Sequence, residues 1–418
     1  MIQVAQVTRS DLMGGRFTGF SVRHLLAERG IESRHLVFDP LSDDPAVTRI
    51  LDYPGSRRFV AAASRAEYRR GHHALFQAHS LGLPAHRAFR RADVVHYHVI
   101  HDGFFSIAAL PLLTRLKPSV WTWHDPWIMT GHCMHPIECG RWRTGCGACP
   151  DLRRPFEMAF DNTARSFAVK RRIVNATRAD IVLASRWMMR MAEASPMARG
   201  ARLHHVPFGV DLSRFAPRDP APARAALGIR PDDVVVAVRG FGSPLKGTAE
   251  LVQALEAVTA PITLLLMQDD GAFDRLIGRH RIVSLDWSND EEALIRAYAA
   301  ADLFAMPSTG EAFGMMAVEA MACGKPVVVF EGTALPEVTF APECGIAVPL
   351  RDVAALAAAV QYLATDEADR LARGRRAREL AERHYSADLY ADRLADLYRA
   401  KARRDDTGER AAPMDAAA

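Results

Sequence analysis

Short apolar segments alternate with amphipathic helical segments along most of this 418-residue chain, and this alternation constrains the fold more than any other feature. Strands are predicted at residues 2–7, 94–98, 119–123, 181–185, 234–238, 262–267, 303–306 and 326–330. Helices are predicted at residues 22–29, 251–258, 291–301, 313–323, 353–363 and 366–384. Because alternating strands and helices form parallel sheets with helices on both faces, the sequence predicts an α/β protein.

The pattern runs through the chain twice, which predicts two domains. We expect an N-terminal domain over residues 1–200 and a C-terminal domain over residues 201–385, each a doubly wound, Rossmann-like sheet. A helix at residues 386–400 is expected to pack back on the N-terminal domain. Residues 401–418 are charged and then alanine-rich, so we expect a disordered tail there.

The charge of the chain limits its partners. A formal net charge of +4 at pH 7 is too small to indicate a nucleic-acid-binding protein. The distribution is uneven, because residues 57–91 contain eight arginines and a single acidic residue, Glu67. Such a stretch is either a solvated helical face or a surface that rests on anionic lipid.

Neither a secretory signal nor a membrane span is predicted. Residues 1–7 already have the pattern of a strand, and no apolar run approaches the ~18 residues that a membrane span requires. We therefore expect a cytoplasmic protein, either free or peripheral on the inner face of the membrane.

Two glutamates, Glu311 and Glu319, flank the start of one predicted helix. Glu311 lies in the loop between the strand at 303–306 and the helix at 313–323, where α/β proteins hold ligands. Glu319 lies about two turns inside that helix. Backbone amides near Phe313 and Gly314 are available to an anion. The alternative is a helix with one solvated and one capping carboxylate.

This segment resembles the Glu-x7-Glu motif of retaining nucleotide-sugar glycosyltransferases of the glycosyltransferase 4 (group 1) family, which have the two-domain GT-B fold. The resemblance covers roughly residues 2–398 and is strongest at 124–150, 207–217 and 307–329, although Phe208 replaces the usual asparagine. The resemblance implies two Rossmann-like domains that face a cleft. It also implies that Glu311 meets the donor sugar and that Glu319 binds the ribose of the nucleotide.

Two cations, Arg239 and Lys246, follow the predicted strand at 234–238. In the family such a pair holds the donor diphosphate, whose departure builds negative charge that fixed cations stabilise. The alternative is two exposed cations on a loop. Gly14 and Gly15 follow the first strand, and the resemblance places this loop near the donor phosphates, although an ordinary turn also explains two glycines.

A histidine, His124, ends the predicted strand at 119–123, and Asp125 follows it. Relatives with this fold place a histidine here, near the donor sugar, so we expect His124 on the acceptor side with Asp125 beside it. Imidazole exchanges hydrogen bonds with hydroxyl groups near its ordinary pKa. His98, at the end of the strand at 94–98, is a second candidate. The alternative for each is a satisfied buried imidazole.

Four of the six cysteines lie in a loop at residues 131–150: Cys133, Cys139, Cys146 and Cys149. Four thiolates suit a structural zinc ion, although this spacing is looser than that of paired Cys-x2-Cys knuckles. Reduced thiols and, less favoured in a cytoplasmic protein, disulfides are the alternatives. A subset of polysaccharide-assembly glycosyltransferases carries a similar cysteine block. Cys323 and Cys344 are expected to be ordinary buried residues.

The sequence thus predicts a retaining glycosyltransferase for cell-surface polysaccharide biosynthesis. The resemblance implies a nucleotide-sugar donor, a glycan or lipid-linked acceptor, and a leaving phosphate that helps to deprotonate the acceptor. No Asp-x-Asp motif is present, so no catalytic metal cofactor is expected. Two alternatives are a zinc-ribbon-like nucleic-acid-binding protein and an epimerase of the same fold. Transfer to an acceptor distinguishes the enzyme from the epimerase.

Overall fold

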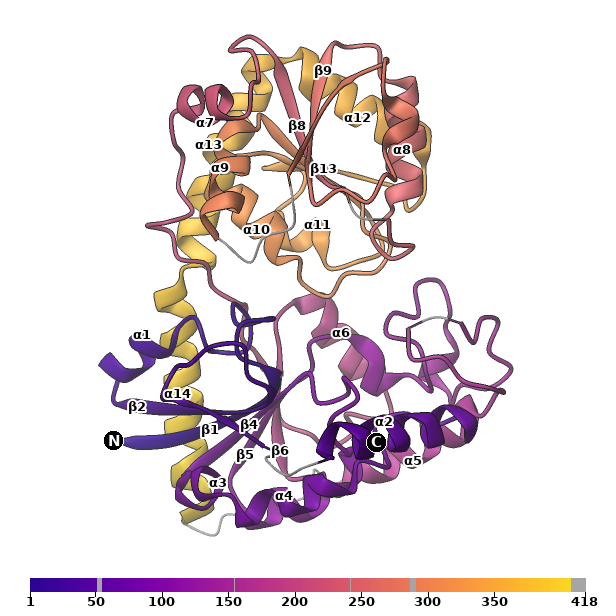
Figure 1. The fold of residues 1–418 in the computed structure, drawn as a ribbon, viewed down its shortest axis with the longest axis vertical. Coiled ribbons are helices and arrows are strands. Elements are labelled where there is room, and N and C mark those ends of the chain that lie inside the picture. Colours follow the sequence, from indigo (N-terminus) through magenta and orange to yellow (C-terminus); the bar gives the residue numbers. More distant parts are fainter. Residues whose placement is uncertain (51–54, 154, 241, 286–290, 407–418) are drawn as a thin grey trace, which may run out of the picture. The chain divides into compact units, whose positions relative to one another are not determined.

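The computed structural model describes residues 1–50, 55–153, 155–240, 242–285 and 291–406. The chain divides into two compact units, one formed by Met1–Gly209 with Asp388–Ala418 and the other by Val210–Ala387. The first boundary therefore lies after Gly209 rather than after residue 200. Each unit is built around one parallel sheet with helices on both faces (Figure 1).

The sheet of the N-terminal unit has seven strands in the order β3-β2-β1-β4-β5-β6-β7. All its neighbouring strands pair in parallel. The strands are β1 (Ile2–Ser10), β2 (Ile31–Asp39), β3 (Val47–Arg49), β4 (Val94–His98), β5 (Ser119–Thr122), β6 (Ala179–Leu183) and β7 (Leu203–His205). The predicted strands at 2–7, 94–98, 119–123 and 181–185 correspond to β1, β4, β5 and β6.

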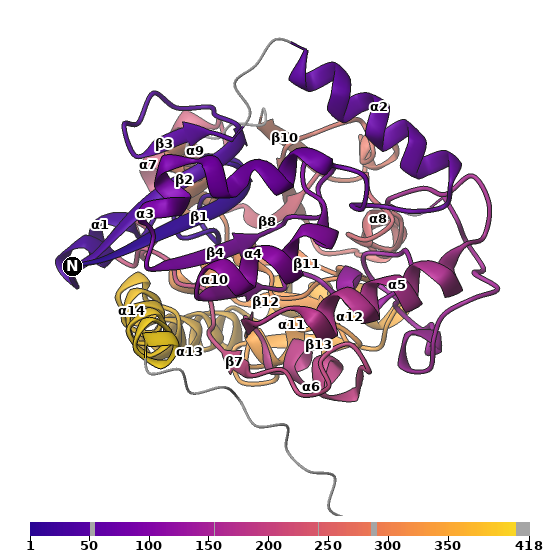
Figure 2. The same cartoon turned by 90° about the horizontal axis from the view of Figure 1, so that it is seen from below.

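Seven α-helices belong to the described part of the N-terminal unit. They are α1 (Arg23–Glu28), α2 (Ser56–Arg69), α3 (Arg87–Arg91), α4 (Leu110–Leu116), α5 (Thr163–Ala176), α6 (Arg186–Ala194) and α14 (Ala387–Asp406). Figure 2 shows α2 at the outer edge of this unit, beyond the strands of its sheet. Five of the eight arginines in the arginine-rich stretch lie on or directly after α2, and the other three lie on α3.

Helix α14 returns to the N-terminal sheet and corrects the expected start of the tail. The helix continues to Asp406, so the prediction of disorder is wrong for residues 401–406. Lys401 is buried, and its ammonium donates to a carboxylate oxygen of Asp180 at 3.1 Å. This contact ties the last turns of the helix to β6 and so stabilises them. The rest of the predicted tail, residues 407–418, lies outside the described residues.

The sheet of the C-terminal unit has six parallel strands in the order β10-β9-β8-β11-β12-β13. They are β8 (Val234–Arg239), β9 (Ile262–Met267), β10 (Arg281–Leu285), β11 (Leu303–Met306), β12 (Val327–Phe330) and β13 (Gly345–Val348). The order reverses between β8 and β11, which is the arrangement of a doubly wound sheet. Strands β8, β9, β11 and β12 are nearly continuous apolar runs because both faces of the sheet are covered there, whereas the edge strand β10 is partly exposed.

Helices cover the two faces of this second sheet. They are α7 (Pro220–Ala226), α8 (Thr248–Ala257), α9 (Glu291–Ala300), α10 (Met315–Ala322), α11 (Leu335–Val338), α12 (Val353–Thr365) and α13 (Glu367–His384). Alternate strand residues such as Val236 and Val238 pack with α8 and α12 in one apolar cluster. Helices α9 and α10 lie on the other face (Figure 1). Within the described ranges, no helix has the length and apolar character that a membrane crossing demands.

Candidate active site

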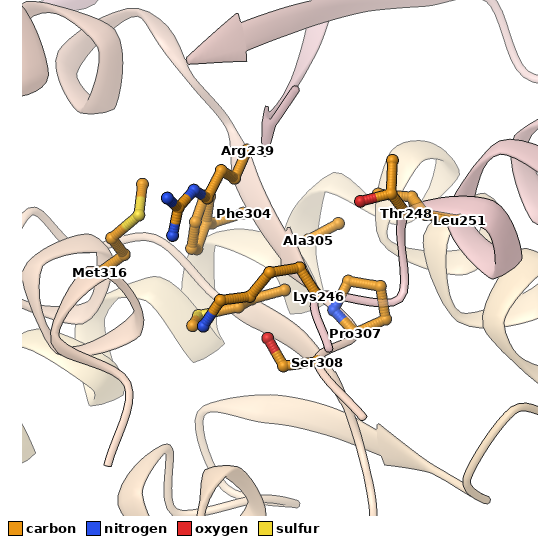
Figure 3. A pocket seen from close by; sticks show the side chains of 10 residues that line it. Arg239, Lys246, Thr248, Leu251, Phe304, Ala305, Pro307, Ser308 and Met316 are labelled. Carbon is orange, nitrogen blue, oxygen red and sulfur yellow. The ribbon is translucent and has the colours of Figure 1, made fainter. Parts of the chain in front are cut away.

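The candidate donor site in the C-terminal unit lies where the strand order reverses, between β8 and β11. In open α/β sheets, ligands bind at the carboxyl ends of the strands at this point. A pocket is present here between the ends of β8 and β11 (Figure 3). Its lining residues are Arg239, Lys246, Thr248, Leu251, Phe304, Ala305, Met306, Pro307, Ser308 and Met316.

Both predicted phosphate ligands line this pocket. Arg239 is the last residue of β8, and Lys246 lies in the loop that follows. Their side chains extend to the same side of the pocket, away from Thr248 and Leu251 (Figure 3). The Lys246 ammonium also lies 2.7 Å from a carboxylate oxygen of Glu311. The fold therefore brings together three predicted site residues from two loops.

Close backbone contacts hold these two loops together. Gly247, directly after Lys246, has a φ of +66°, and a Cβ there would lie 1.9 Å from the carbonyl oxygen of Pro307. The Thr309 hydroxyl donates to the carbonyl of Pro244 at 2.8 Å. The Thr309 amide donates to the carbonyl of Leu245 at 3.0 Å. Glycine at position 247 thus permits the approach that sets Lys246 beside Glu311.

The other predicted donor residues are more enclosed. Glu319 is fully buried on α10, and the Tyr298 hydroxyl lies 3.2 Å from one of its carboxylate oxygens. Phe313 is buried edge-on against Tyr385. Gly314 precedes α10 with a φ of +94°, and a Cβ there would meet Leu335 at 2.5 Å. The ribose contact of Glu319 and the amide contacts of Phe313 and Gly314 stay predictions.

In the N-terminal unit, the loop after β1 needs both of its predicted glycines. Gly14 has a φ of +82°, and a Cβ at Gly15 would lie 2.6 Å from the carbonyl oxygen of Asp11. The Asp11 carboxylate accepts hydrogen bonds from the amides of Leu41 and Ser42, which fixes the base of the loop. A tight turn therefore accounts for the two glycines, and their approach to a phosphate stays a prediction.

His124 and His98, the predicted acceptor-side histidines, are in contact. Their nearest ring nitrogens, His124 Nε2 and His98 Nδ1, are 3.1 Å apart. The His124 ring also lies 5.2 Å from the ring of Phe17 and stacks on Phe208 at 5.5 Å. Burial lowers the pKa of His124 to about 3, so its imidazole is neutral at physiological pH. Phe208, which replaces the family's asparagine, contributes an apolar wall rather than an amide.

Asp125 points to a different set of partners from its neighbour His124. Burial raises the pKa of Asp125, but the ion pair with His101 and the amide of Trp127 outweigh it and bring the pKa to about 2. One Asp125 oxygen accepts from Trp127 at 2.8 Å, and the other lies 3.0 Å from His101 Nε2. Lys170 of α5 also holds this segment, donating to the carbonyl of Trp127 at 2.9 Å. These contacts give Asp125 a structural role, and its predicted place on the acceptor side stays a prediction.

The four predicted zinc ligands lie in a loop that the structure describes throughout. Among the described residues, Cys133, Cys139, Cys146 and Cys149 form no disulfide bond. Over the described ranges, which include this whole loop, no three His, Cys, Asp or Glu side chains are arranged to hold a metal ion. Burial raises the pKa of the Cys146 thiol to about 11. The structural zinc ion and its alternatives therefore stay predictions. Cys323 and Cys344 are buried, as predicted.

Three buried residues beside the histidine pair were missed by the sequence analysis: Gln6, His96 and Tyr398. Gln6 bonds to His98, and Tyr398 bonds to both Gln6 and His96. A signal for one of them was present, because His96 and His98 alternate within one strand and so share a face. Nothing local in the sequence connects Tyr398 to that strand.

Comparison with known proteins gives consistent matches. A family model described as "Glycosyl transferases group 1" matches residues 232–366. The D-inositol 3-phosphate glycosyltransferase of Saccharomonospora viridis is 30% identical over 330 residues, which are 73% of this chain and 70% of that protein. The matched segment of the family model contains Arg239, Lys246, Glu311 and Glu319.

Solved structures show the same fold. Sucrose-phosphate synthase from Thermosynechococcus elongatus superposes with a TM-score of 0.70 at 20% identity, covering 96% of this chain and 99% of that one. Anabaena Alr3699/HepE in complex with UDP and glucose superposes with a TM-score of 0.64 at 17% identity, covering 95% and 99%. The prediction of a GT-B fold with two Rossmann-like domains is confirmed.

Proposed function

This chain belongs to the glycosyl transferases group 1 family and is a glycosyltransferase, and on that premise we propose that it uses a nucleotide-sugar donor and retains the anomeric configuration. The proposed acceptor is a glycan or a lipid-linked oligosaccharide, and the proposed role is cell-surface polysaccharide biosynthesis. Family membership argues against the nucleic-acid-binding alternative.

One observation carries the donor proposal: two cations and a carboxylate converge at the switch point of the C-terminal sheet. Arg239 and Lys246 line the pocket together, and the Lys246 ammonium reaches Glu311 at 2.7 Å. A guanidinium and an ammonium stabilise the charge that builds on a departing diphosphate. Glu311 would then lie at the sugar end of that diphosphate. The solved neighbour with UDP and glucose supports a nucleotide-sugar donor.

The acceptor side rests on His124, whose neutral imidazole is suited to exchanging a hydrogen bond with a sugar hydroxyl. We assign no protein nucleophile, since the leaving phosphate is proposed to take the acceptor proton. The relative from S. viridis is named for an inositol phosphate. A small phosphorylated polyol is therefore a second acceptor class to test beside lipid-linked glycans.

We also propose that α2 rests on an anionic membrane surface. Its outward residues combine positive charge with aromatic rings: Arg57 is exposed, and Phe59 and Tyr68 are each 44% exposed. Cations and amphipathic aromatic side chains together favour the interface of an anionic bilayer. Sedimentation with vesicles that contain anionic lipid, compared with neutral vesicles, tests this surface separately from catalysis.

Calorimetric titration with UDP, GDP, ADP and CMP tests the donor site. We expect one nucleoside diphosphate to bind, and we expect Arg239→Gln and Lys246→Gln to weaken that binding by about 10- to 100-fold, because each removes a charge-assisted hydrogen bond. Arg279→Gln is the matched control, since it removes an exposed cation of the same unit that does not line the pocket.

The outcomes separate the alternatives. Equal affinity of the two pocket variants and the control would refute the diphosphate site. Release of nucleoside diphosphate that depends on an added acceptor supports the transferase, whereas interconversion of the nucleotide sugar without an acceptor supports the epimerase. Nucleotide binding without either reaction, over both acceptor classes, would contradict the proposed acceptors.

A further inference from the structure

A continuous chain of hydrogen bonds runs beneath His124 in the N-terminal unit. Its five bonds have lengths of 2.7–3.1 Å between donor and acceptor atoms. In order, it connects Thr122, His96, Tyr398, Gln6, His98 and His124. All of these residues except His124 are buried.

Strand register explains why these side chains meet. Gln6 of β1 pairs with His96 of β4, and His98 pairs with Thr122 of β5. Paired residues in a parallel sheet, and residues two apart in one strand, point to the same face. This face is covered by α14, which supplies the Tyr398 hydroxyl. The C-terminal helix therefore completes a polar network within the sheet that carries His124.

The Gln6 amide sets the direction of the whole chain. Its nitrogen donates to the Tyr398 hydroxyl at 3.1 Å, so its oxygen is the atom that accepts from His98 Nε2 at 2.8 Å. Burial lowers the pKa of His98 well below its ordinary value, so this imidazole is neutral and carries one proton. With that proton on Nε2, His98 Nδ1 is an acceptor.

The same reasoning fixes the proton on His124. His98 Nδ1 accepts, so His124 must donate from Nε2, and a neutral His124 then has a lone pair on Nδ1. Within the part of the chain that the structure describes, no hydrogen bond to His124 Nδ1 is formed, and the residue is only partly buried. The rings of Phe17 and Phe208 on its sides offer no hydrogen-bond donor.

We propose that Gln6, His98 and Tyr398 are positioning residues that hold His124 with its proton on Nε2, so that Nδ1 meets a sugar hydroxyl as a hydrogen-bond acceptor. The ligand group is therefore a hydroxyl that donates. This inference rests on the proposed function for the identity of the ligand, but the proton position itself does not depend on activity.

Nitrogen NMR of the full-length protein with ¹⁵N-labelled histidine measures the proton position directly. Loss of signals in His124→Gln assigns the two nitrogens of His124. Protonated Nε2 and bare Nδ1 in the wild-type protein are the expected result. A proton on Nδ1 would overturn the proposal, because it would mean that the Gln6 amide and every bond of the chain have the reverse direction.

Tyr398→Phe tests the positioning role, and Tyr390→Phe is its matched control. Both remove one buried hydroxyl from α14, but the Tyr390 hydroxyl donates to the carbonyl of Phe17 and lies outside the chain. In Tyr398→Phe we expect two tautomers of His124 and a kcat/KM lowered about tenfold, with unchanged nucleoside diphosphate affinity. The control should keep one tautomer.

Equal behaviour of the two variants in the NMR spectrum and in kcat/KM would overturn the positioning role. The outcome is distinct from failure of the proposed function, which would appear as wild-type protein that binds no nucleoside diphosphate. Wild-type NMR keeps the proposal testable even where Tyr398→Phe folds poorly.

Discussion

Replacing Gly247 with alanine should destabilise the C-terminal unit more than the same replacement at a glycine that has a positive φ but no close neighbour. The backbone at Gly247 has a φ of +66°, a conformation that costs an L-amino acid about 1–2 kcal/mol. The new Cβ would also lie 1.9 Å from the carbonyl oxygen of Pro307, so the two loops must separate by more than an ångström. Overpacking of this kind typically costs about 1–3 kcal/mol. The expected total is about 2–5 kcal/mol.

Gly278→Ala isolates the steric part of this cost. Gly278 lies in the same unit with a φ of +85°, but a Cβ there has no atom within 4 Å. Gly278→Ala should therefore lower the free energy of unfolding only by the cost of the positive φ. Equilibrium urea unfolding followed by circular dichroism measures both variants. We expect a difference of about 2 kcal/mol between them, or about 4–8 °C in Tm for a unit of this size.

The binding site provides a second measurement on the same pair. Because Gly247 directly follows Lys246, separating the loops should also move the ammonium away from Glu311 and weaken nucleoside diphosphate binding. Gly278→Ala should bind like the wild-type protein. If Gly247→Ala is no less stable than Gly278→Ala, the close contact with Pro307 does not hold the site, and this reasoning is wrong.

Two further predictions concern stability in the N-terminal unit. His35 is fully buried, neither ring nitrogen has a hydrogen-bond partner among the described residues, and burial lowers its pKa from 6.5 to about 4. Since the unfolded chain takes up a proton first as the pH falls below about 6.5, the wild-type protein should lose about 2 kcal/mol at pH 5 through this residue. His35→Leu should remove that loss at pH 5 and change little of the pH dependence above pH 7, as measured by urea unfolding at both pH values. The buried carboxylate of Glu67 accepts from three consecutive amides at residues 74–76, so Glu67→Ala should cost about 3 kcal/mol of unfolding free energy by leaving them unsatisfied. Glu28→Ala, an exposed helical control, should change the urea midpoint little, and equal midpoints for the two variants would contradict the assigned role of Glu67.

The elements that the sequence predicted best are those whose pattern is set by burial on both faces. Strand β9 spans the predicted residues Ile262–Met267. A short run of large apolar residues between two helices is typical of a strand that is buried on both faces. Strand β2 was not predicted, although it pairs along nearly its whole length with β1. Its segment 31–39 includes Glu32, Arg34 and His35, and only the sheet context makes those polar residues part of a strand.

Some residues of the candidate site are positioned by the local sequence, and others are positioned by contacts with distant parts of the chain. Arg239 and Lys246 were predictable because one strand end and its loop place both at the same edge of the sheet. The orientation of Asp125 was not predictable. Adjacent residues of an extended segment point to opposite sides, so His124 and Asp125 have different partners. The sequence does not indicate that the partner of Asp125 is His101. The cysteine spacing left three alternatives open because spacing does not determine where the sulfur atoms lie.

Tyr398 marks the physical limit of reading this site from the sequence. The amphipathic pattern predicted its helix, but its function depends on the bond to Gln6, a residue 392 positions earlier in the chain. That bond exists only because α14 returns to the first sheet and meets the face on which Gln6 and His96 are paired. A residue whose role is to direct the proton on His124 therefore carries no sign of that role in its own neighbourhood. The role of Tyr398 depends instead on the donor and acceptor directions of every hydrogen bond that connects it to His124.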